Sequence, residues 1–251
     1  MLKISVVTVC YNAETSIDKT MNSVISQDYN NIDYLIIDGK STDNTINIVT
    51  GYQKEYNNIR LISEKDNGIY NAMNKGARNA LGEYVFFLNS GDVFPDSQII
   101  SKVASKLETE RPDIIYGNID VDYGTHKHNI QYANKKRLNK FLIALGITVC
   151  HQAVFARTEL VKNRGFNENF KLWADQEWLM YVLDKKAKIQ TIEQTVCIYD
   201  GFGASASADN LELVFKESDM ITKKYSPVIY YMTKPMKWIL RIYRRWQRRN
   251  G

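Results

Sequence analysis

The chain has 251 residues, of which 44% are apolar and 24% charged, which excludes a disordered protein and allows one large α/β domain or two small ones. Residues 220–251 contain nine basic residues and no acidic residue, whereas the rest of the chain contains 24 basic and 28 acidic residues. A mildly acidic body with a basic end is unlike a nucleic-acid-binding domain, whose fold itself is basic, so we expect no nucleic-acid partner.

The first ninety residues alternate between predicted strands and helices. Buried apolar strands are expected at residues 4–10, 34–38, 59–63 and 84–88, with helices at 16–27, from 44 onwards and at 69–79 between them. This β-α-β order predicts a parallel sheet with right-handed crossovers. No glycine precedes Gly39, so the glycine-rich turn of a dinucleotide-binding fold is missing, and Tyr34 stands where a phosphate-binding P-loop needs its first glycine.

Polar residues recur where these predicted strands end. Asp38, Asp66, Asn89 and Asp92 would all lie at the carboxyl edge of one sheet, where open α/β sheets form their ligand crevice. Asp92, just beyond the central strand, offers a hard oxygen ligand for a divalent cation. A turn explains each of these residues equally well on its own, but their recurrence at one edge predicts a binding site.

The second half of the chain places further polar residues among predicted strands and helices. The expected elements are helices at 97–107, 137–145, 159–164, from 174 and at 210–224, and strands at 112–117, 118–123, 128–133, 149–155 and 195–199. His151 and Gln152 begin one strand and are interpreted as partnered core residues or as site residues. Asp175 and Glu177 open a helix, where the dipole favours carboxylates and where a general base could face the crevice. The small residues 201–208 suit a loop over the site or a plain linker.

Residues 232–249 form a predicted basic amphipathic helix. Lys237, Arg241, Arg244, Arg245 and Arg248 share one face, and Met236, Ile239, Leu240, Tyr243 and Trp246 share another. Such a helix suits an anionic membrane surface; the alternative is a helix docked on the core with its basic face in water. The three cysteines are far apart, without CxxC spacing or a disulfide framework. Together these features predict a cytoplasmic protein that is peripherally associated with the inner face of the cell membrane.

Several stretches carry a recognisable pattern. They are Ser5-Val-Val-Thr-Val-Cys-Tyr11-Asn12-Ala13, Ser23-Val-Ile-Ser-Gln27, Ile36-Ile-Asp38-Gly39-Lys-Ser41-Thr42-Asp43, Asp66-Asn-Gly68-Ile-Tyr70-Asn-Ala-Met-Asn-Lys75-Gly76 and Leu88-Asn89-Ser90-Gly91-Asp92. Together they resemble the family 2 inverting glycosyltransferases, densely over residues 4–92 and again at Cys150-His151-Gln152 and Ala174-Asp175-Gln176-Glu177. Each stretch alone is weak, but the combination is specific to that family.

The resemblance implies a GT-A fold, which is Rossmann-like α/β with a mostly parallel central sheet flanked by helices. It implies a catalytic domain over residues 1–225, with a nucleotide-sugar-binding half at 1–95, an acceptor-binding half at 96–225, and the tail at 226–251. The residues implied for the nucleotide sugar are Tyr11, Asn12, Asp38, Asp66, Asn71, Lys75, Asn89 and Ser90. Asp92 would hold Mn²⁺ or Mg²⁺, and Asp175 would be the catalytic base. His151, Gln152, Glu177 and Trp178 are expected to be acceptor-binding or secondary site residues.

The implied reaction moves a sugar from a nucleotide sugar, with uridine as the family's commonest base, to a hydroxyl of a glycan acceptor. A polyprenyl-diphosphate-linked acceptor would explain the basic tail and would place the enzyme in surface polysaccharide biosynthesis, such as that of capsule or O-antigen. A metal at Asp92 would offset charge on the leaving phosphate, and Asp175 would take the acceptor proton, which inverts the anomeric carbon.

Three residues depart from the family pattern. Asn89 replaces the first carboxylate of the family's DxD metal motif, Lys40 stands where a small residue is usual, and Asn71 stands where aspartate is common. Asn89 keeps an alternative open, namely a nucleotide-sugar-binding or scaffolding protein that retained the fold without catalysis. A sugar-phosphate nucleotidyltransferase would need a glycine-rich, arginine-containing loop after the first strand, which this sequence lacks.

Overall fold

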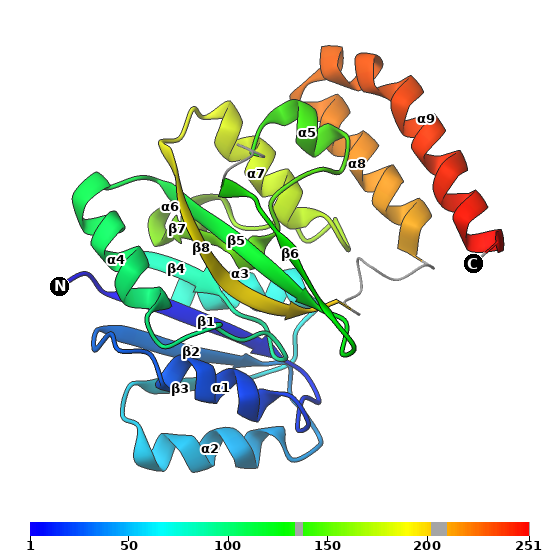
Figure 1. The fold of residues 1–251 in the computed structure, drawn as a ribbon. Coiled ribbons are helices and arrows are strands. Elements are labelled where there is room, and N and C mark those ends of the chain that lie inside the picture. Colours follow the sequence, from blue (N-terminus) through cyan, green and yellow to red (C-terminus); the bar gives the residue numbers. More distant parts are fainter. Residues whose placement is uncertain (134–137, 202–209, 251) are drawn as a thin grey trace.

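An eight-stranded sheet forms the centre of the computed structural model, which describes residues 1–133, 138–201 and 210–250 (Figure 1). The strands are β1 (Ile4–Cys10), β2 (Ile32–Asp38), β3 (Ile59–Ser63), β4 (Tyr84–Phe87), β5 (Ile114–Asp122), β6 (Lys127–Ile130), β7 (Val154–Arg157) and β8 (Ile189–Asp200). The helices are α1 (Ile17–Ile25), α2 (Thr45–Glu55), α3 (Ile69–Asn79), α4 (Ile99–Glu110), α5 (Lys140–Ala144), α6 (Thr158–Arg164), α7 (Ala174–Asp184), α8 (Leu211–Tyr225) and α9 (Pro227–Asn250). Within these ranges no helix combines the length and apolar character that spanning a membrane requires.

The sheet runs in the order β3-β2-β1-β4-β7-β5-β6, and β8 pairs with β5. The first four strands are parallel, as the β-α-β pattern predicts. Every residue of β1 and β2 is buried, because helices cover this part of the sheet on both faces. The carboxyl ends of β1, β2 and β4 therefore meet at one edge, where the residues that follow each strand can converge.

The strand predictions in the second half of the chain need correction, and the predicted strand 128–133 is the shorter β6 (Lys127–Ile130). The two strands predicted at 112–117 and 118–123 are one strand, β5 (Ile114–Asp122), and Gly117 within it lets β8 approach so closely that a Cβ atom there would lie 2.5 Å from Val196. For the same reason β8 extends beyond residues 195–199 and pairs with β5 along most of its length. His151 and Gln152 lie in a 3₁₀ turn closed by the Ala153 amide, and β7 begins only at Val154.

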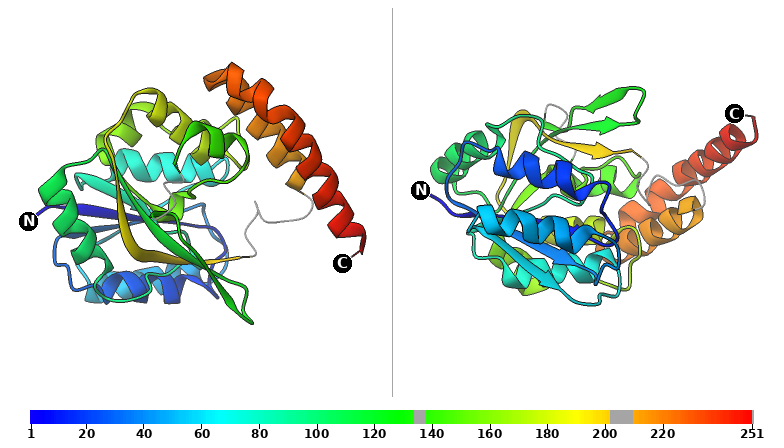
Figure 2. Two further views of the ribbon diagram at one scale, coloured as in Figure 1. Left: turned by 45° about the horizontal axis from the view of Figure 1, so that its top comes forward. Right: turned by 90° about the horizontal axis from the view of Figure 1, so that it is seen from below.

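The C-terminal helices lie together beside the sheet. The predicted helix at 137–145 begins within the described residues at Lys140, where the Asn139 side chain accepts from the Leu142 amide. Helix α8 packs against α5, α7 and α9. Helix α9 runs along the outer side of α8 at the periphery of the molecule, and its end projects beyond the body (Figures 1 and 2). Of the predicted loop 201–208, residues 202–208 lie outside the described residues.

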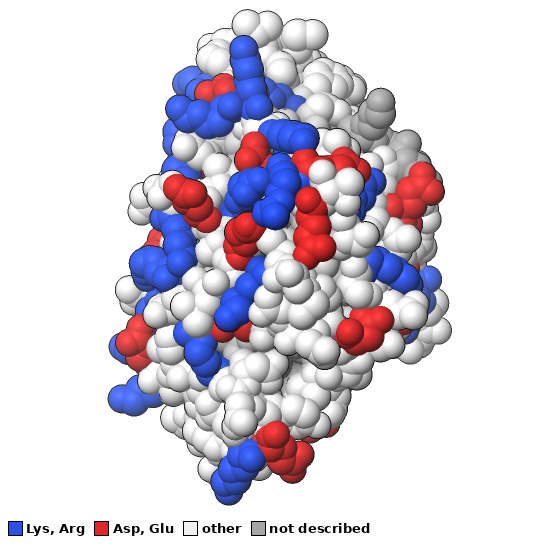
Figure 3. Space-filling view, turned by 90° about the vertical axis from the view of Figure 1, so that its left-hand side faces the viewer, with Lys and Arg blue, Asp and Glu red and all other residues white. Residues whose placement is uncertain are grey.

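The side of the molecule near α4 and the N-terminus carries both signs of charge interspersed, as Figure 3 shows. Two exposed ion pairs tie this region together, between Arg111 and Glu83 at 2.8 Å and between Arg157 and Asp113 at 3.4 Å. The excess of positive charge on the chain therefore belongs to its C-terminal part and not to this face.

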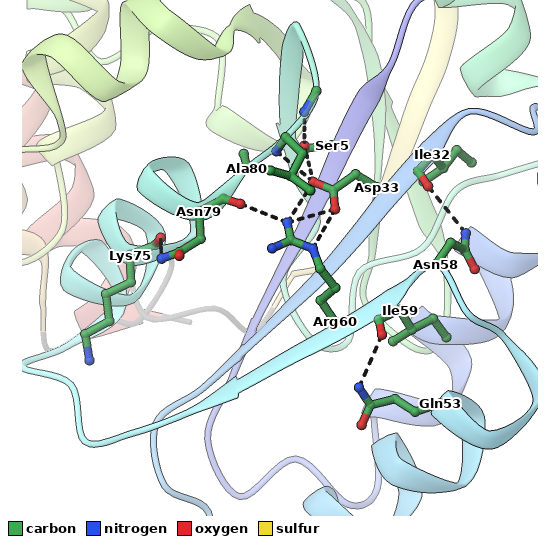
Figure 4. Close-up of polar contacts among 12 residues, drawn as sticks. Ser5, Ile32, Asp33, Gln53, Asn58, Ile59, Arg60, Lys75, Asn79 and Ala80 are labelled. Atoms are coloured by element: carbon green, nitrogen blue, oxygen red, sulfur yellow. Dashed lines mark hydrogen bonds and ion pairs between the residues drawn. The ribbon is translucent and has the colours of Figure 1, made fainter.

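A buried carboxylate fastens the amino ends of the first strands, opposite the edge where the strands end. Asp33 of β2 accepts hydrogen bonds from the Ser5 hydroxyl at 2.6 Å, from the Arg60 guanidinium at 2.8 and 3.0 Å and from the Leu81 amide at 2.9 Å (Figure 4). This cluster joins β1, β2, β3 and the segment that leads into β4. Because the cluster lies at the edge opposite the one where the strands end, its role is to stabilise the fold.

We expect Asp33→Asn to lower the free energy of unfolding by about 2–4 kcal/mol, because it leaves the buried end of the Arg60 charge uncompensated and removes an acceptor from Ser5 or Leu81. Urea denaturation measures the change. The matched variant Asp28→Asn replaces an exposed carboxylate and should stay within about 0.5 kcal/mol of the original chain. Equal stability of the two variants would contradict a structural role for Asp33.

Candidate active site

A cleft opens at the carboxyl edge of the sheet, between the loop after β4, the 3₁₀ turn and the start of α7. Its walls include six of the predicted site residues, which are Asn89, Ser90, Asp92, His151, Gln152 and Asp175. They come from three separate parts of the chain, and the fold brings them together. The remaining wall comes mainly from Tyr70 on α3, the loop 171–173, and Tyr199 at the end of β8.

The residues expected at the nucleotide base lie at the end of β2. Asp38 is fully buried, and its carboxylate accepts hydrogen bonds from the Ser41 amide at 3.0 Å, the Ser63 hydroxyl at 2.7 Å and the Ser41 hydroxyl. In the protein without ligand, Asp38 therefore orients Ser41 and Ser63 beside the expected nucleotide-base site. Tyr11 is 63% exposed, which leaves an aromatic face free for stacking.

Gly39 lies between Tyr11 and Asp66. A Cβ atom at Gly39 would come within 2.6 Å of the Asp66 carboxylate and 3.3 Å of the Tyr11 ring. The missing side chain therefore allows the aromatic ring and the carboxylate to border one small space. Asn12 fixes the adjacent turn in a left-handed conformation at φ 48°, where its side-chain oxygen accepts from the Thr42 amide at 2.9 Å.

Three further residues that were predicted to bind the nucleotide sugar make contacts within the protein. Lys75 donates to the Lys65 carbonyl at 2.7 Å and pairs with Glu64 at 3.0 Å, so its ammonium group lies beside the loop that holds Asp66. Asn71 donates to Glu168 at 2.9 Å and thereby ties α3 to the loop before α7. The Ser90 hydroxyl lies 2.9 Å from that of Ser16 at the start of α1.

Asp175 lies at the first turn of α7 and is 7% exposed. One carboxylate oxygen accepts from the Tyr70 hydroxyl at 3.3 Å, and the other lies 3.2 Å from His151 Nδ1. The amide nitrogen of Asn89 lies 3.0 Å from His151 Nε2. Because that amide donates to Nε2, the imidazole proton is on Nδ1 and points at Asp175. A hydrogen-bonded chain thus links the loop after β4 to the carboxylate on α7.

Tyr70 stays a hydrogen-bond donor within this chain. Burial and the neighbouring Asp175 carboxylate raise its pKa well above the ordinary range. Its single hydroxyl proton is shared between the Leu172 carbonyl at 2.7 Å and Asp175 at 3.3 Å. The tyrosine therefore joins Asp175 to the loop that precedes α7.

Asp92 is buried, and burial raises the pKa of its carboxyl to about 6. Its oxygen Oδ1 accepts a long contact from the Asp200 amide at 3.4 Å, the Gln152 side chain also interacts with the carboxyl, and Oδ2 has no hydrogen-bond partner. The side-chain oxygen of Asn89 is also buried without a partner. Asp92 Oδ2 and Asn89 Oδ1 are thus two oxygen atoms that accept no hydrogen bond, and such oxygens suit a hard divalent cation as ligands.

The described residues contain no group of three or more His, Cys, Asp or Glu side chains placed to hold a metal. This donor set suits a cation of the Mg²⁺ type, which is bound through one or two carboxylates together with substrate phosphates. Asp92 and Asn89 would thus hold such a metal jointly with a phosphate-bearing ligand.

Glu177 and Trp178 do not lie in the cleft, which corrects their predicted place near the acceptor. Glu177 is fully buried and accepts from Arg164 at 2.8 Å, Lys224 at 2.7 Å and the Tyr225 hydroxyl at 2.7 Å. Two residues along a helix turn the side chain by about 200°, so Glu177 points away from Asp175 and braces α7 against α6 and α8. Trp178 is 3% exposed and packs against Phe166 in the core.

One residue of the site escaped sequence reasoning. Glu217 on α8 is 3% exposed and accepts three backbone hydrogen bonds, from Lys171 at 2.7 Å, Leu172 at 3.0 Å and Trp173 at 2.9 Å. It therefore fixes the loop that leads into Asp175. A single carboxylate on an amphipathic helix carries no sequence signal for this role. Tyr70, in contrast, lies within the stretch 66–76 that resembles the family.

Comparison with known proteins gives the family of the chain. The family model described as glycosyl transferase family 2 matches residues 5–165. An uncharacterized glycosyltransferase of Mycobacterium tuberculosis is 28% identical over 205 residues, which are 81% of this chain and 77% of that protein. The Escherichia coli UDP-Glc:alpha-D-GlcNAc-diphosphoundecaprenol beta-1,3-glucosyltransferase WfaP is 25% identical over 226 residues, covering 87% and 85% of the two chains.

Among solved structures, Staphylococcus aureus TarS 1–349 in complex with UDP-GlcNAc superposes with a TM-score of 0.71 at 21% identity, over 89% of this chain and 71% of TarS. That likeness confirms the GT-A fold, and the family match covers more than half of the chain. The chain therefore belongs to glycosyl transferase family 2 and is a glycosyltransferase.

Proposed function

We propose that this enzyme transfers a sugar, with inversion, from a UDP-sugar to a hydroxyl of a lipid-linked glycan acceptor in surface polysaccharide biosynthesis. The observation that carries the proposal is the cleft itself. It holds one carboxylate, Asp175, that is oriented by hydrogen bonds, and a second carboxylate, Asp92, that has an unpartnered oxygen. A displacement at a sugar carbon needs a base for the acceptor proton and positive charge at the leaving diphosphate. Asp175 would supply the base, and a metal held by Asp92 would supply the positive charge.

Asp175 would act as the general base. Its carboxylate contacts Tyr70 and His151 and also accepts from the backbone amide of Gln176 at 2.8 Å and from the Gln176 side-chain amide at 3.3 Å. These contacts fix its direction. As the acceptor oxygen attacks the anomeric carbon, its proton moves to Asp175. Attack from the side opposite the leaving diphosphate inverts that carbon.

Asp92 and Asn89 would hold Mn²⁺ or Mg²⁺ at the leaving diphosphate. The metal would supply positive charge that stabilises the departing nucleotide. The residues of the chain itself provide the oxygen ligands, and the link from Asn89 to His151 keeps this loop in register with Asp175.

Two features support a lipid-linked acceptor, namely the end of the cleft beside α8, which we call the acceptor end, and the C-terminal tail. The loop 171–173 and Val214 of α8 line the cleft, and α8 carries α9. WfaP, by its name, acts on a diphosphoundecaprenol-linked sugar. We propose that residues 232–249 hold the enzyme to an anionic membrane surface, at the inner face of the cell membrane, where such an acceptor would lie.

A thermal-shift screen of UDP, GDP and common UDP-sugars, each with and without Mn²⁺, tests the donor site. A ligand that binds only the folded chain raises the melting temperature by mass action. We expect UDP to raise it, and Mn²⁺ to enlarge the shift. If UDP-sugars bind but no sugar is transferred or hydrolysed, the binding or scaffolding alternative that Asn89 keeps open would replace the enzyme proposal.

We expect Glu217→Gln to lower kcat about 10–100-fold with a smaller effect on the KM of the donor. The amide nitrogen of glutamine replaces one acceptor oxygen, so the loop 171–173 loses at least one hydrogen bond and Asp175 loses its exact position. Release of UDP measures transfer. Glu159→Gln, an exposed carboxylate on α6, serves as the matched control and should leave kcat unchanged. Equal rates in both variants would exclude a positioning role for Glu217.

A further inference from the structure

The first half of α9 exposes large apolar side chains on one side. Val228, Tyr231, Met232, Trp238 and Ile239 are between 61% and 72% exposed. Their spacing of three, four, ten and eleven residues from Val228 places them along one side of the helix. We call these five residues the α9 stripe. Five such side chains on one surface exceed what scattered apolar residues on a soluble face would require.

The opposite side of α9 is fastened to α8 by charged groups. Lys237 is 3% exposed and donates to Ser218 and Asp219, each at 2.9 Å. Arg241 donates to Asp219 at 3.0 Å and lies over the Phe215 ring at 4.8 Å. These contacts fix the rotation of the helix, and that rotation directs the α9 stripe outward.

This arrangement corrects the predicted amphipathic face. Lys237 and Arg241 were expected to share a surface-facing basic side, but both pair with Asp219 of α8, and the Lys237 side chain is buried there. A helical projection cannot anticipate a carboxylate on the neighbouring helix. Among the α9 residues whose side chains the structure describes, which are 227–239 and 241, the large exposed side chains are mainly apolar.

The charge around the α9 stripe identifies the class of its partner. Residues 220–251 include no acidic residue, and Lys223 of α8 and Lys234 of α9 are exposed. A second copy of the chain packed through the same surface would bring these basic segments together, which is repulsive. An anionic lipid surface offers apolar depth for the stripe and negative headgroups for the lysines.

We infer that the α9 stripe inserts into the interfacial layer of an anionic lipid surface, while Lys237 and Arg241 act as internal fasteners. The inference rests on the membrane association proposed above and names the surface that makes it. The helix lies along the outside of α8, at the periphery in both views of Figure 2, so the body does not obstruct it. It would then lie in the plane of the lipid surface beside the acceptor end of the cleft.

Co-sedimentation of the full chain with vesicles tests the inference. The vesicles are phosphatidylcholine alone or phosphatidylcholine mixed with phosphatidylglycerol. The test variant is Tyr231→Ser with Ile239→Ser, which removes two apolar groups without changing charge. The matched control is Tyr56→Ser with Leu81→Ser, which removes two exposed apolar groups far from α9. The UDP-induced thermal shift of every variant reports that the fold and donor site remain intact.

We expect binding to the anionic vesicles, at least a tenfold loss of affinity in the α9 variant, and no loss in the control. Unchanged binding of the α9 variant would overturn the inference. So would a dimer that dissociates in the α9 variant while no protein sediments with vesicles, because the stripe would then belong to a second copy. In both cases a persisting UDP shift would leave the donor site of the glycosyltransferase standing.

Discussion

Asp175→Asn should abolish sugar transfer while leaving the fold and UDP binding intact. Asparagine keeps the shape of the side chain and can still accept from Tyr70, but it cannot take the proton of the acceptor hydroxyl. Loss of a general base costs about 10²–10⁴-fold in rate. We therefore expect kcat to fall by about that factor, with the UDP-induced thermal shift unchanged. Release of UDP in the presence of an acceptor measures the rate.

The same helix supplies the control for this variant. Asp184 lies at the far end of α7 and pairs with Lys140 at 2.7 Å, with its side chain half exposed. Asp184→Asn removes one carboxylate from the same helix without touching the cleft, so its rate should match that of the original chain. Ordinary turnover by Asp175→Asn would assign the base to another group and would remove the main support for the proposed mechanism.

The sheet could be predicted from the sequence as far as β4, because a strand that is buried on both faces has a continuous run of apolar residues. Residues 84–88 are such a run, and the polar residues after it fall at the predicted edge. Beyond residue 110, β5 and β8 are longer than their apolar segments. In β8, for example, Gln190 and Glu193 lie within a strand that exists because β5 pairs with it.

The candidate site could also be predicted only in part, because the sequence shows its polar residues but not how they pack. Asp175 and Glu177 stand two residues apart in one helical turn, and both suit the helix dipole equally well. Only the packing shows that Arg164, Lys224 and Tyr225 surround Glu177, whereas Asp175 opens to the cleft. These partners lie up to 48 residues away along the chain, so no local pattern reports them.

Asp92→Asn should remove the effect of Mn²⁺ on UDP binding and, at the same time, stabilise the protein that holds no ligand. The pKa of Asp92 in the fold is about 6, above its ordinary value of 3.8, because burial disfavours the charged form. A carboxyl with a raised folded-state pKa destabilises the fold as the pH rises from about 4 to about 6. At pH 7.5 the full cost is present, about 3 kcal/mol at 1.36 kcal/mol for each pKa unit.

Asparagine has no charge to bury, so we expect Asp92→Asn to raise the free energy of unfolding by about 1–3 kcal/mol at pH 7.5 and to gain nothing below pH 4. Urea denaturation at the two pH values measures this, and Asp96→Asn, an exposed carboxylate four residues later, should show neither effect. A less stable Asp92→Asn protein with an intact Mn²⁺-dependent UDP shift would show that Asp92 is structural. The expected pair of results, higher stability and lost metal dependence, would show that the fold tolerates an unfavourable buried charge because the donor complex needs it.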